Sequence, residues 1–332
     1  MNCNKKILIC GGTGCLSSKS DEIKKNLEKY IAEYNVKDVE VVLTGCFGFC
    51  EKGPIVKIVP ENTFYIEVKP EDAEEIIKVD IVDGEKIERL LYIDPKTEER
   101  IHDSKDMEFY QKQERRALKN CGVIDPENIE DFLKNDGYKG IEKVLKTMSN
   151  RDVIKEIFAS GLRGRGGGGF LTGIKWEIAS NIEAEQKYIV CNADEGDPGA
   201  FMDRSILEGD PHSVIEGMMI AGYAIGATKG LVYIRAEYPL AIHRLSVAIE
   251  AARKKGFLGK NILGTDFEFD FFLPPIDDEG SAKLCTMVDQ SFMVNPNSDC
   301  AEEAVEFLEY WVTDGALTWS ETTMMPLITG ES

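Results

Sequence analysis

Three features of this sequence predict an α/β fold divided into more than one domain. The chain has 332 residues, a length at which two domains are the usual expectation. Hydrophobic residues make up 43% of it, which is typical of a globular protein and excludes disorder along the whole chain. Segments with the apolar spacing of helices alternate with short apolar runs that are typical of buried strands.

The charge balance limits the partners and the compartment. The sequence has 39 Lys and Arg against 59 Asp and Glu, a formal net charge of −20, which argues against nucleic acid as a partner because two polyanions repel. No apolar run reaches the roughly 18 residues of a membrane span. The apolar residues at 7–10 are too few for a secretory signal. We therefore expect a cytoplasmic protein, whose nine cysteines need an explanation other than disulfides.

The first 78 residues predict a small layer of sheet and helices. The turn signal Pro60-Glu-Asn-Thr separates two apolar runs and predicts a hairpin. Acidic residues after Pro70 fit the first turns of a helix. The expected elements are a strand at 5–10, a helix over 19–35, strands at 39–43, 54–59 and 63–68, and a helix from Pro70. This βαβββα order fits a thioredoxin-like domain.

Three further regions follow. Residues 79–125 are charge-rich and weakly periodic, which predicts a connector on a neighbour's surface. Residues 126–273 begin with helices that end at a capping Gly161, and then alternate in the way of a mainly parallel, covered sheet. The expected elements are helices at 172–181, 211–226 and 239–255 and strands at 187–191, 231–235 and 267–273. After Pro274-Pro275, residues 274–332 form a separate, mostly helical stretch with a helix near 299–313.

Two pairs of cysteines predict a metal centre. They are Cys10 with Cys15 and Cys46 with Cys50, and both pairs lie in glycine-containing loops just after predicted strands. Such loops can bring four sulfurs together. Four thiolates from two loops suit a [2Fe–2S] cluster, whereas structural zinc more often binds pairs spaced by two. Four buried cysteines without metal are the remaining alternative. The other cysteines are expected to be unliganded: Cys3, Cys121, Cys191, Cys285 and Cys300.

A glycine-rich loop at 161–169 predicts an anion site. It contains a G-x-G-x-x-G match, but a helix precedes it where a dinucleotide fingerprint needs a strand, so a standard Rossmann site is rejected. Consecutive glycines before a helix expose N–H groups that bind anions. Arg163, Arg165 and Lys175 add positive charge nearby. The alternative is a flexible surface linker.

An acidic loop, CNADEGDPG at 191–199, follows the predicted strand 187–191, at the end where α/β sheets bind ligands. Asn192 could bond a ring edge, and three carboxylates could accept from ribose hydroxyls: Asp194, Glu195 and Asp197. A solvated acidic turn is an equally good interpretation. No shared spacing links the histidines, which gives little support to a histidine metal site or a catalytic triad. They are His102, His212 and His243.

With these motifs in view, the sequence resembles two known families. Residues 1–75 resemble the thioredoxin-like [2Fe–2S] domain that is fused to, or partnered with, NADH-oxidising flavoproteins. Residues 90–273 resemble the front half of the flavoprotein subunit of respiratory complex I and its hydrogenase relatives. The phrases CGVIDPENIEDF, GLRGRGGGGFLTGIKW and CNADEGDPGAFMDR carry this second resemblance. The order of the two parts resembles the β subunit of NAD(P)-linked [FeFe]-hydrogenases.

The resemblance implies the cofactors and the residues around them. The [2Fe–2S] cluster would be bound by Cys10, Cys15, Cys46 and Cys50. FMN would lie along Gly164, Arg165, Gly166 and Gly167, with Lys175, Asn192, Asp194 and Glu195 around its phosphate, ribityl chain and ring. Phe170 would stack on the nucleotide, and Lys175 and Asp197 would help to place NADH. Ile178 stands where the family has an aromatic residue.

The implied function is a subunit of an NAD(P)H-linked flavin and iron–sulfur oxidoreductase. NADH would give a hydride to the flavin, and iron–sulfur clusters would take the electrons singly, so no catalytic acid or base is expected among the side chains. The expected partners are other iron–sulfur subunits of a hydrogenase or dehydrogenase complex. The alternative is a [2Fe–2S] electron carrier without flavin catalysis.

The resemblance is expected to stop after Leu273. The family's second glycine-rich loop and its [4Fe–4S] cysteine run have no counterpart, so we expect no [4Fe–4S] site and an incomplete flavin pocket, which could leave the enzyme inactive. The segment MVNPNSDCAEEAVEFLEYWVTDGA instead resembles the end of extracellular solute-binding proteins of ABC importers, or any amphipathic helix. It predicts a foreign tail joined near Leu273–Pro275, by a gene junction or a sequence error. A fragment of such a binding protein is the third functional hypothesis.

Overall fold

The computed structural model describes residues 5–197, 199–272, 306 and 310, and residues 1–273 form one compact unit. A four-stranded and a three-stranded sheet divide this unit into a first lobe, residues 5–110, and a second lobe, residues 120–272, and a two-stranded sheet of β5 and β6 belongs to the first lobe. The predicted junction near 273 and the predicted helix near 299–313 lie outside the described residues, except that Glu306 and Tyr310 are helical.

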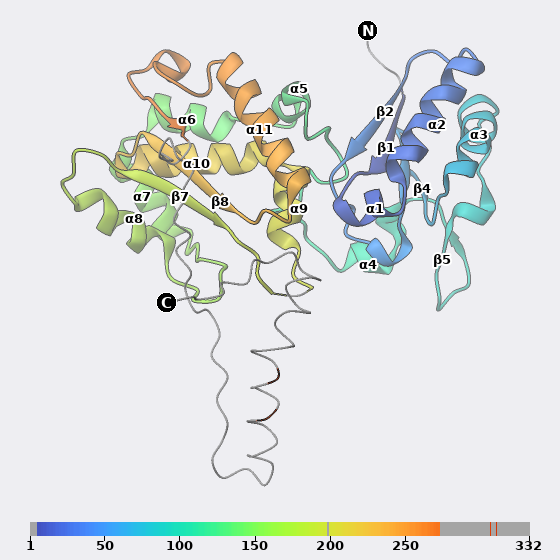
Figure 1. Cartoon of the computed structure of the whole chain (residues 1–332), viewed down its shortest axis with the longest axis horizontal. Helices are drawn as coiled ribbons and strands as arrows, with labels where there is room; N and C mark the ends of the chain where they lie inside the picture. The colour runs from blue at the N-terminus through green and yellow to red at the C-terminus, as the bar shows by residue number, and fades with distance from the viewer. Residues whose placement is uncertain (1–4, 198, 273–305, 307–309, 311–332) are drawn as a thin grey trace. The chain divides into compact units, whose positions relative to one another are not determined.

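A four-stranded sheet in the order β2-β1-β3-β4 forms the base of the first lobe (Figure 1). Its strands are β1 (Lys5–Cys10), β2 (Val39–Thr44), β3 (Val56–Val59) and β4 (Thr63–Tyr65). β1 pairs with β2 in parallel and with β3 in antiparallel, and β3 and β4 form the predicted hairpin. The predicted order of strands and helices along the chain is confirmed for this domain.

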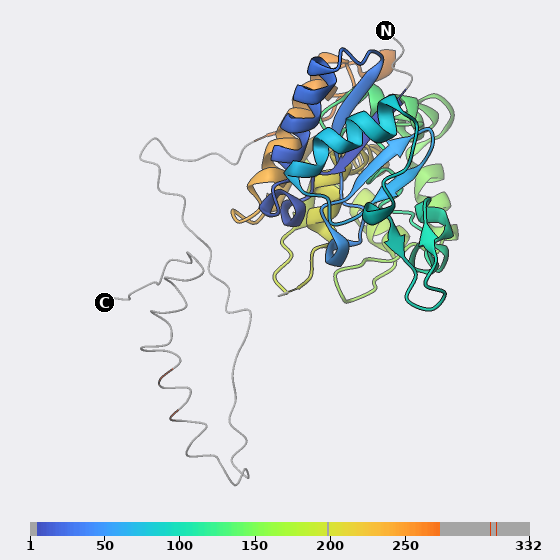
Figure 2. The same ribbon diagram turned by 90° about the vertical axis from the view of Figure 1, so that its right-hand side faces the viewer.

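Helices cover one face of this sheet. α2 (Ser20–Glu33) lies beside α3 (Ala73–Glu75), which follows a 3-10 turn at Pro70–Asp72 and continues into a wider turn at Ile76–Val82 (Figure 2). Along β1, Ile7 and Ile9 face these helices, because successive side chains of a strand point to opposite faces. A single-turn helix inside the first cysteine loop, α1 (Thr13–Ser17), has no counterpart in the sequence prediction.

The charge-rich segment after residue 79 packs on the first lobe. Leu90 and Leu91 join the core beneath the helices, and Met107 is fully buried on the opposite face of the sheet. The segment therefore lies on a neighbouring surface, as predicted, and completes both cores. Its short elements, together with the turn after the second cysteine loop, are Cys50–Lys52, Glu88–Leu90, β5 (Tyr92–Ile93), β6 (Arg100–Ile101), Ser104–Asp106 and α4 (Glu108–Gln111).

The second lobe starts with three helices, within the region before Gly161 that the sequence predicts to be helical. They are α5 (Ile129–Lys134), α6 (Lys139–Thr147) and α7 (Asn150–Ala159). Tyr138 has a left-handed backbone before α6, and the Ser149 side chain caps α7, so each break has a local cause. Gly161 follows α7 with a φ of +67°, which confirms the predicted glycine cap.

A three-stranded parallel sheet follows, as predicted. Its strands are β7 (Tyr188–Ala193), β8 (Lys229–Ile234) and the short β9 (Asp270–Phe271). The helices are α8 (Thr172–Asn181), α9 (Met202–Gly209), α10 (Pro211–Ile225), α11 (Pro239–Lys254) and a 3-10 turn at Ile262–Gly264. α10 packs on β7 and β8. Val190 and Tyr233 are 59% and 61% exposed, so within the described residues the cover over the sheet is incomplete.

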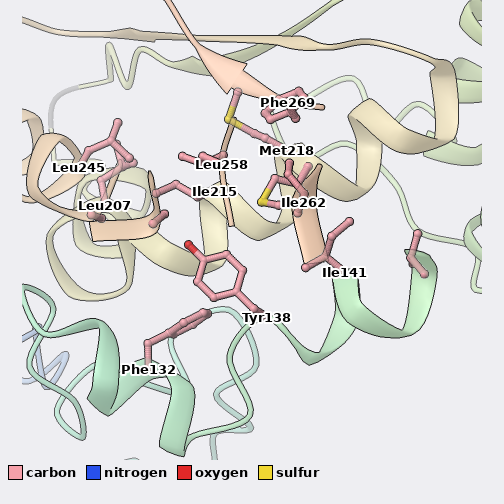
Figure 3. Packing of buried hydrophobic residues seen from close by; sticks show 14 of the residues in the cluster. Phe132, Tyr138, Ile141, Leu207, Ile215, Met218, Leu245, Leu258, Ile262 and Phe269 are labelled. Carbon is pink, nitrogen blue, oxygen red and sulfur yellow. The ribbon is translucent and has the colours of Figure 1, made fainter. Parts of the chain in front are cut away.

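The core of the second lobe joins elements that are far apart in sequence. Ile215 of α10 and Ile141 of α6 are fully buried, and Leu207 of α9 lies near Leu245 of α11 (Figure 3). Buried apolar area of this kind supplies most of the stabilisation of a domain. In the described part of the chain, no helix combines the length and the apolar character that crossing a membrane requires.

Replacing Ile215 with alanine should lower the free energy of unfolding by about 2–5 kcal/mol, because it opens a cavity in this core. Urea denaturation followed by circular dichroism measures the loss. The control is Ile242→Ala on α11, where the side chain is 38% exposed and the loss should be about 1 kcal/mol or less. Equal losses in the two variants would contradict this packing.

Candidate functional site

The parallel pairing of β1 and β2 brings the four predicted cluster cysteines to one edge of the first sheet. Cys10 ends β1 opposite Thr44, the last residue of β2, and Cys46 follows two residues later. The Cys46 and Cys50 sulfurs are 3.8 Å apart, and the Cys10 thiol contacts those of Cys15 and Cys46. Two loops thus present four neighbouring thiols.

The neighbouring thiols shift one another's pKa values in different directions. The neighbouring Cys15 thiol raises the pKa of Cys10 to about 12, and the Cys10 thiol raises the pKa of Cys46 to about 11. The contact with Cys10 lowers the pKa of Cys15. Metals bind thiolates, so a cationic centre between these sulfurs would favour the ionised forms. In the part of the chain that the structure describes, no three or more His, Cys, Asp or Glu are placed as ligands of one metal ion.

The backbone around the sulfurs fits a cluster. The N–H of Gly48 donates to Cys46 Sγ at 3.2 Å, the type of contact that the glycine-containing loops predict. A Cβ atom at Gly53 would lie 2.8 Å from Cys15 Sγ, so only glycine leaves that sulfur its space. Cys10, Cys15 and Cys46 are buried, whereas Cys50 is exposed. The donor set and this cradle are those that a [2Fe–2S] centre needs.

The glycine-rich loop is closed at its base by hydrogen bonds. Gly164 N donates to Phe170 O and Thr172 N donates to Leu162 O, both at 2.9 Å. The Arg163 guanidinium donates to Gly169 O, also at 2.9 Å, and so holds the loop from inside. A flexible linker has no such closure, so the geometry favours a formed loop.

The glycine-rich loop has hydrogen-bond donors that find no acceptor within the described structure. In the described structure, the five backbone N–H groups of residues 165–169 have no protein acceptor, and neither Arg165 nor Lys175 has a carboxylate partner. α8 begins at Thr172, directly beyond the loop. Free N–H groups, two cations and a helix start are together the features that an anion site requires.

In the acidic loop, the carboxylates have different environments. Glu195 is buried, and its carboxylate accepts the N–H groups of Asp203 and Arg204, at 3.1 and 3.2 Å, at the start of α9. Asn192 Oδ1 accepts from the N–H of Asp194 at 3.0 Å, which fixes the turn. The side chains of Asn192, Asp194 and Asp197 are exposed. The Glu195 carboxylate is therefore occupied by hydrogen bonds to the backbone of α9, whereas the other three side chains are accessible.

Arg235 and Tyr238 are additional residues at this loop. Arg235 Nη1 donates to Glu195 O at 2.8 Å, and the Tyr238 hydroxyl donates to the same oxygen at 3.3 Å. They were not predicted, although a residue directly after β8 belongs to the same sheet edge as the end of β7. Both loops project along the lower edge of the second lobe in Figures 1 and 2. Phe170 and Ile178 are each 56% exposed.

Comparison with known protein families gives two matches. Residues 2–79 match the family model of the thioredoxin-like [2Fe–2S] ferredoxin, and residues 157–287 match that of the Nuo51 FMN-binding domain. The predicted domain types and the two predicted cofactors are confirmed at the level of these families. The second match runs past residue 273, and the domain boundaries stay predictions.

Curated relatives are similar to a part of this chain. The HndC subunit of the NADP-reducing hydrogenase of Solidesulfovibrio fructosivorans is 63% identical over 162 residues, or 49% of this chain and 33% of that protein. An NADH-quinone oxidoreductase subunit of Aquifex aeolicus is 50% identical over 44% of this chain and 34% of its own length. The chain thus spans about a third of the curated relatives that it matches. A solved thioredoxin-like [2Fe–2S] ferredoxin from Aquifex aeolicus is 29% identical over 26% of this chain and 87% of its own, with a TM-score of 0.24.

Replacing Cys46 with serine should remove the cluster, because Cys46 lies between Cys10 and Cys50. The variant should lose most of about two irons per chain and the visible absorption of the cluster. Iron and sulfide assays after anaerobic purification measure this. Cys191→Ser is the control, since Cys191 lies in β7 and should not affect iron. Full iron in the Cys46 variant would contradict the assignment.

Replacing Gly167 with alanine should weaken flavin binding. Its φ is +104°, a conformation that costs an L-residue about 1–2 kcal/mol, so the dissociation constant should rise about tenfold. Flavin fluorescence titration measures it. Gly168→Ala is the matched control, because that glycine has no positive φ and an added Cβ would meet no atom within 4 Å. Equal binding by both variants and the wild type would show that this loop does not hold the flavin.

Proposed function

We propose that this chain is the flavin and iron–sulfur subunit of an NAD(P)H-linked oxidoreductase, of the hydrogenase or NADH dehydrogenase type, and that it acts in the cytoplasm. The observation that carries the proposal is the presence of two cofactor sites in one compact unit: four neighbouring thiols in the first lobe, and a closed loop of unused N–H donors in the second. The two family matches support this assignment.

The residues divide into groups by the part of the chemistry that each would serve. Cys10, Cys15, Cys46 and Cys50 would bind the [2Fe–2S] cluster. Gly164, Arg165, Gly166, Gly167, Lys175, Asn192, Asp194 and Glu195 would surround FMN. Phe170 would stack on the nucleotide, and Lys175 with Asp197 would place NADH. Bound FMN supplies the exchange between a two-electron donor and one-electron acceptors, and the cluster supplies a one-electron acceptor.

The protein's own contribution is positioning and charge. The free amides of 165–169 would accept the flavin phosphate, and Arg165 and Lys175 would neutralise its charge. Arg235 holds the acidic loop at its backbone and leaves the Asn192 side chain accessible. Phe170, which is 56% exposed, would lose water contact when a nucleotide ring covers it.

The domain organisation that goes with this proposal has four parts. Residues 1–78 are the cluster domain, 79–125 the connector, 126–273 the FMN and NADH-binding part, and 274–332 a separate tail. The proposed partners are iron–sulfur subunits of the same complex. A cluster-only electron carrier is the competing function, because residues 2–79 by themselves match the thioredoxin-like [2Fe–2S] ferredoxin family; it predicts a chain that binds iron but no FMN.

Cofactor analysis of the anaerobically purified chain tests the proposal. We expect about two irons and one FMN per chain, and bleaching of the flavin absorption when NADH or NADPH is added. The comparison of the two nucleotides at equal concentration gives the preference. Two irons without FMN would support the carrier, and FMN that neither nucleotide bleaches would refute the enzyme.

A further inference from the structure

A single short helix contacts both predicted cofactor sites. α9 (Met202–Gly209) starts at the acidic loop, where the Glu195 carboxylate accepts the N–H groups of Asp203 and Arg204. Its other end lies against the two cysteine loops of the first lobe. Eight residues at 1.5 Å each make this helix about 12 Å long. The two sites are therefore joined by one rigid element.

Glu208 makes the contact with the first cysteine loop at the C-terminal end of α9. Its side chain is 2% exposed, and Oε2 accepts the N–H of Thr13 at 3.0 Å while Oε1 accepts the Thr13 hydroxyl. Thr13 starts α1, between Cys10 and Cys15. The nearest cation is Arg204, at 3.9 Å. A buried carboxylate needs such donors, because an unpaired buried charge is strongly destabilising. Both oxygens of Glu208 are thus committed to one residue of the cluster loop.

The second cysteine loop touches the same helix end through its backbone. A Cβ atom at Gly45 would lie 2.6 Å from Cα of Gly209, so only glycine allows this approach. A Cβ atom at Gly209 would collide with Cys121 Sγ. Gly45 directly precedes Cys46. The glycines of the cysteine loop therefore serve the contact with the second lobe as well as the turn around the sulfurs.

α9 is also fixed to the second lobe. Arg244 of α11, which is 2% exposed, donates to the carbonyl oxygen of Glu208 at 2.6 Å. Leu207 is buried in the core beside Leu245 (Figure 3). A helix anchored in this way cannot shift without disturbing the core. The position of Thr13 is thereby tied to the position of the acidic loop.

We infer that α9 is a positioning helix: through Glu195 and Glu208 it holds the two cysteine loops at a fixed separation from the acidic loop at 191–199, so that electrons pass from the flavin to the [2Fe–2S] cluster within one chain. This inference rests on the proposed function. Each NADH releases two electrons and a proton and leaves as NAD+. A bound [2Fe–2S] cluster would accept one of these electrons, as one of its two ferric ions is reduced to ferrous, and a one-electron acceptor of the iron–sulfur class in a partner subunit would accept the other. Glu208 is a positioning residue and has no part in the chemistry itself.

Three variants and one control test the role of α9. Glu208→Ala removes the clamp, Thr13→Val removes only the hydroxyl donor, and Thr13→Ser keeps both donors. Glu142→Gln is the control, because among the described residues this carboxylate on α6 forms a salt bridge only with Lys146. The full-length chain with both cofactors is mixed with NADH under anaerobic conditions. Flavin bleaching and cluster bleaching are followed separately by stopped-flow absorbance.

We expect Glu208→Ala to slow cluster reduction about tenfold or more, because small displacements of reacting centres have large effects on rate. Flavin reduction should keep its rate, and the EPR spectrum of the dithionite-reduced cluster should keep its shape and intensity. Thr13→Val should slow cluster reduction less, and Thr13→Ser should behave as the wild type. The rate of backbone hydrogen exchange at residues 11–18 should rise more in Glu208→Ala than in any other variant.

Wild-type rates of cluster reduction in both Glu208→Ala and Thr13→Val would overturn the inference. If Glu208→Ala does not fold, the comparison of Thr13→Val with Thr13→Ser tests the inference, since both variants keep the Glu208 carboxylate. If NADH fails to bleach the wild-type flavin, the proposed function fails instead. Light-driven reduction of the flavin then replaces NADH, and the same comparison of cluster reduction supports or overturns the role of α9.

Discussion

The parallel pairing of neighbouring strands is the constraint on which both cofactor sites depend. When two parallel strands pair in register, the loops that leave their carboxyl ends emerge at one edge of the sheet. β1 and β2 pair from Lys5 with Val39 to Cys10 with Thr44, so the two cysteine loops start side by side. β7 and β8 pair up to Ala193 with Ile234, which places the acidic loop beside Arg235. A slip of one residue would turn Cys10 to the other face of its sheet.

The sequence was sufficient to predict what local patterns determine. The strands at 5–10 and 39–43, the hairpin around Pro60 and the cap at Gly161 follow from apolar alternation and turn chemistry, and the structure has each of them. α9 was missed because it follows directly on a loop of acidic residues, proline and glycine, and its N-terminal cap comes from Glu195, seven residues before the helix starts. No scan of adjacent residues detects a cap from that distance, since local capping patterns span about three residues.

The glycines of the two cysteine loops show the same limit of prediction from adjacent residues. From sequence, Gly11, Gly12 and Gly45 are interpreted as residues that allow a turn around a metal. In the structure, an added Cβ on Gly11 would lie 3.1 Å from Arg244 Nη2, and one on Gly45 would lie 2.6 Å from Cα of Gly209. The reason for these two glycines thus includes partners in the second lobe, far away in sequence, which is a property of the tertiary structure. The site residues themselves could be predicted, whereas the element that joins the two sites could not.

The charge of the chain makes its unpaired cations informative. With 59 acidic side chains against 39 basic ones, a lysine or arginine has many possible carboxylate partners. From sequence, Arg163, Arg165 and Lys175 form one basic cluster, but in the structure their partners differ. Arg163 donates to the Gly169 carbonyl and thereby builds the loop. Arg165 and Lys175 have no carboxylate partner among the described residues, and the backbone amides of residues 165–169 also lack acceptors there. An anionic ligand would satisfy both sets of donors at once, so the local field of this loop opposes the negative charge of the rest of the protein.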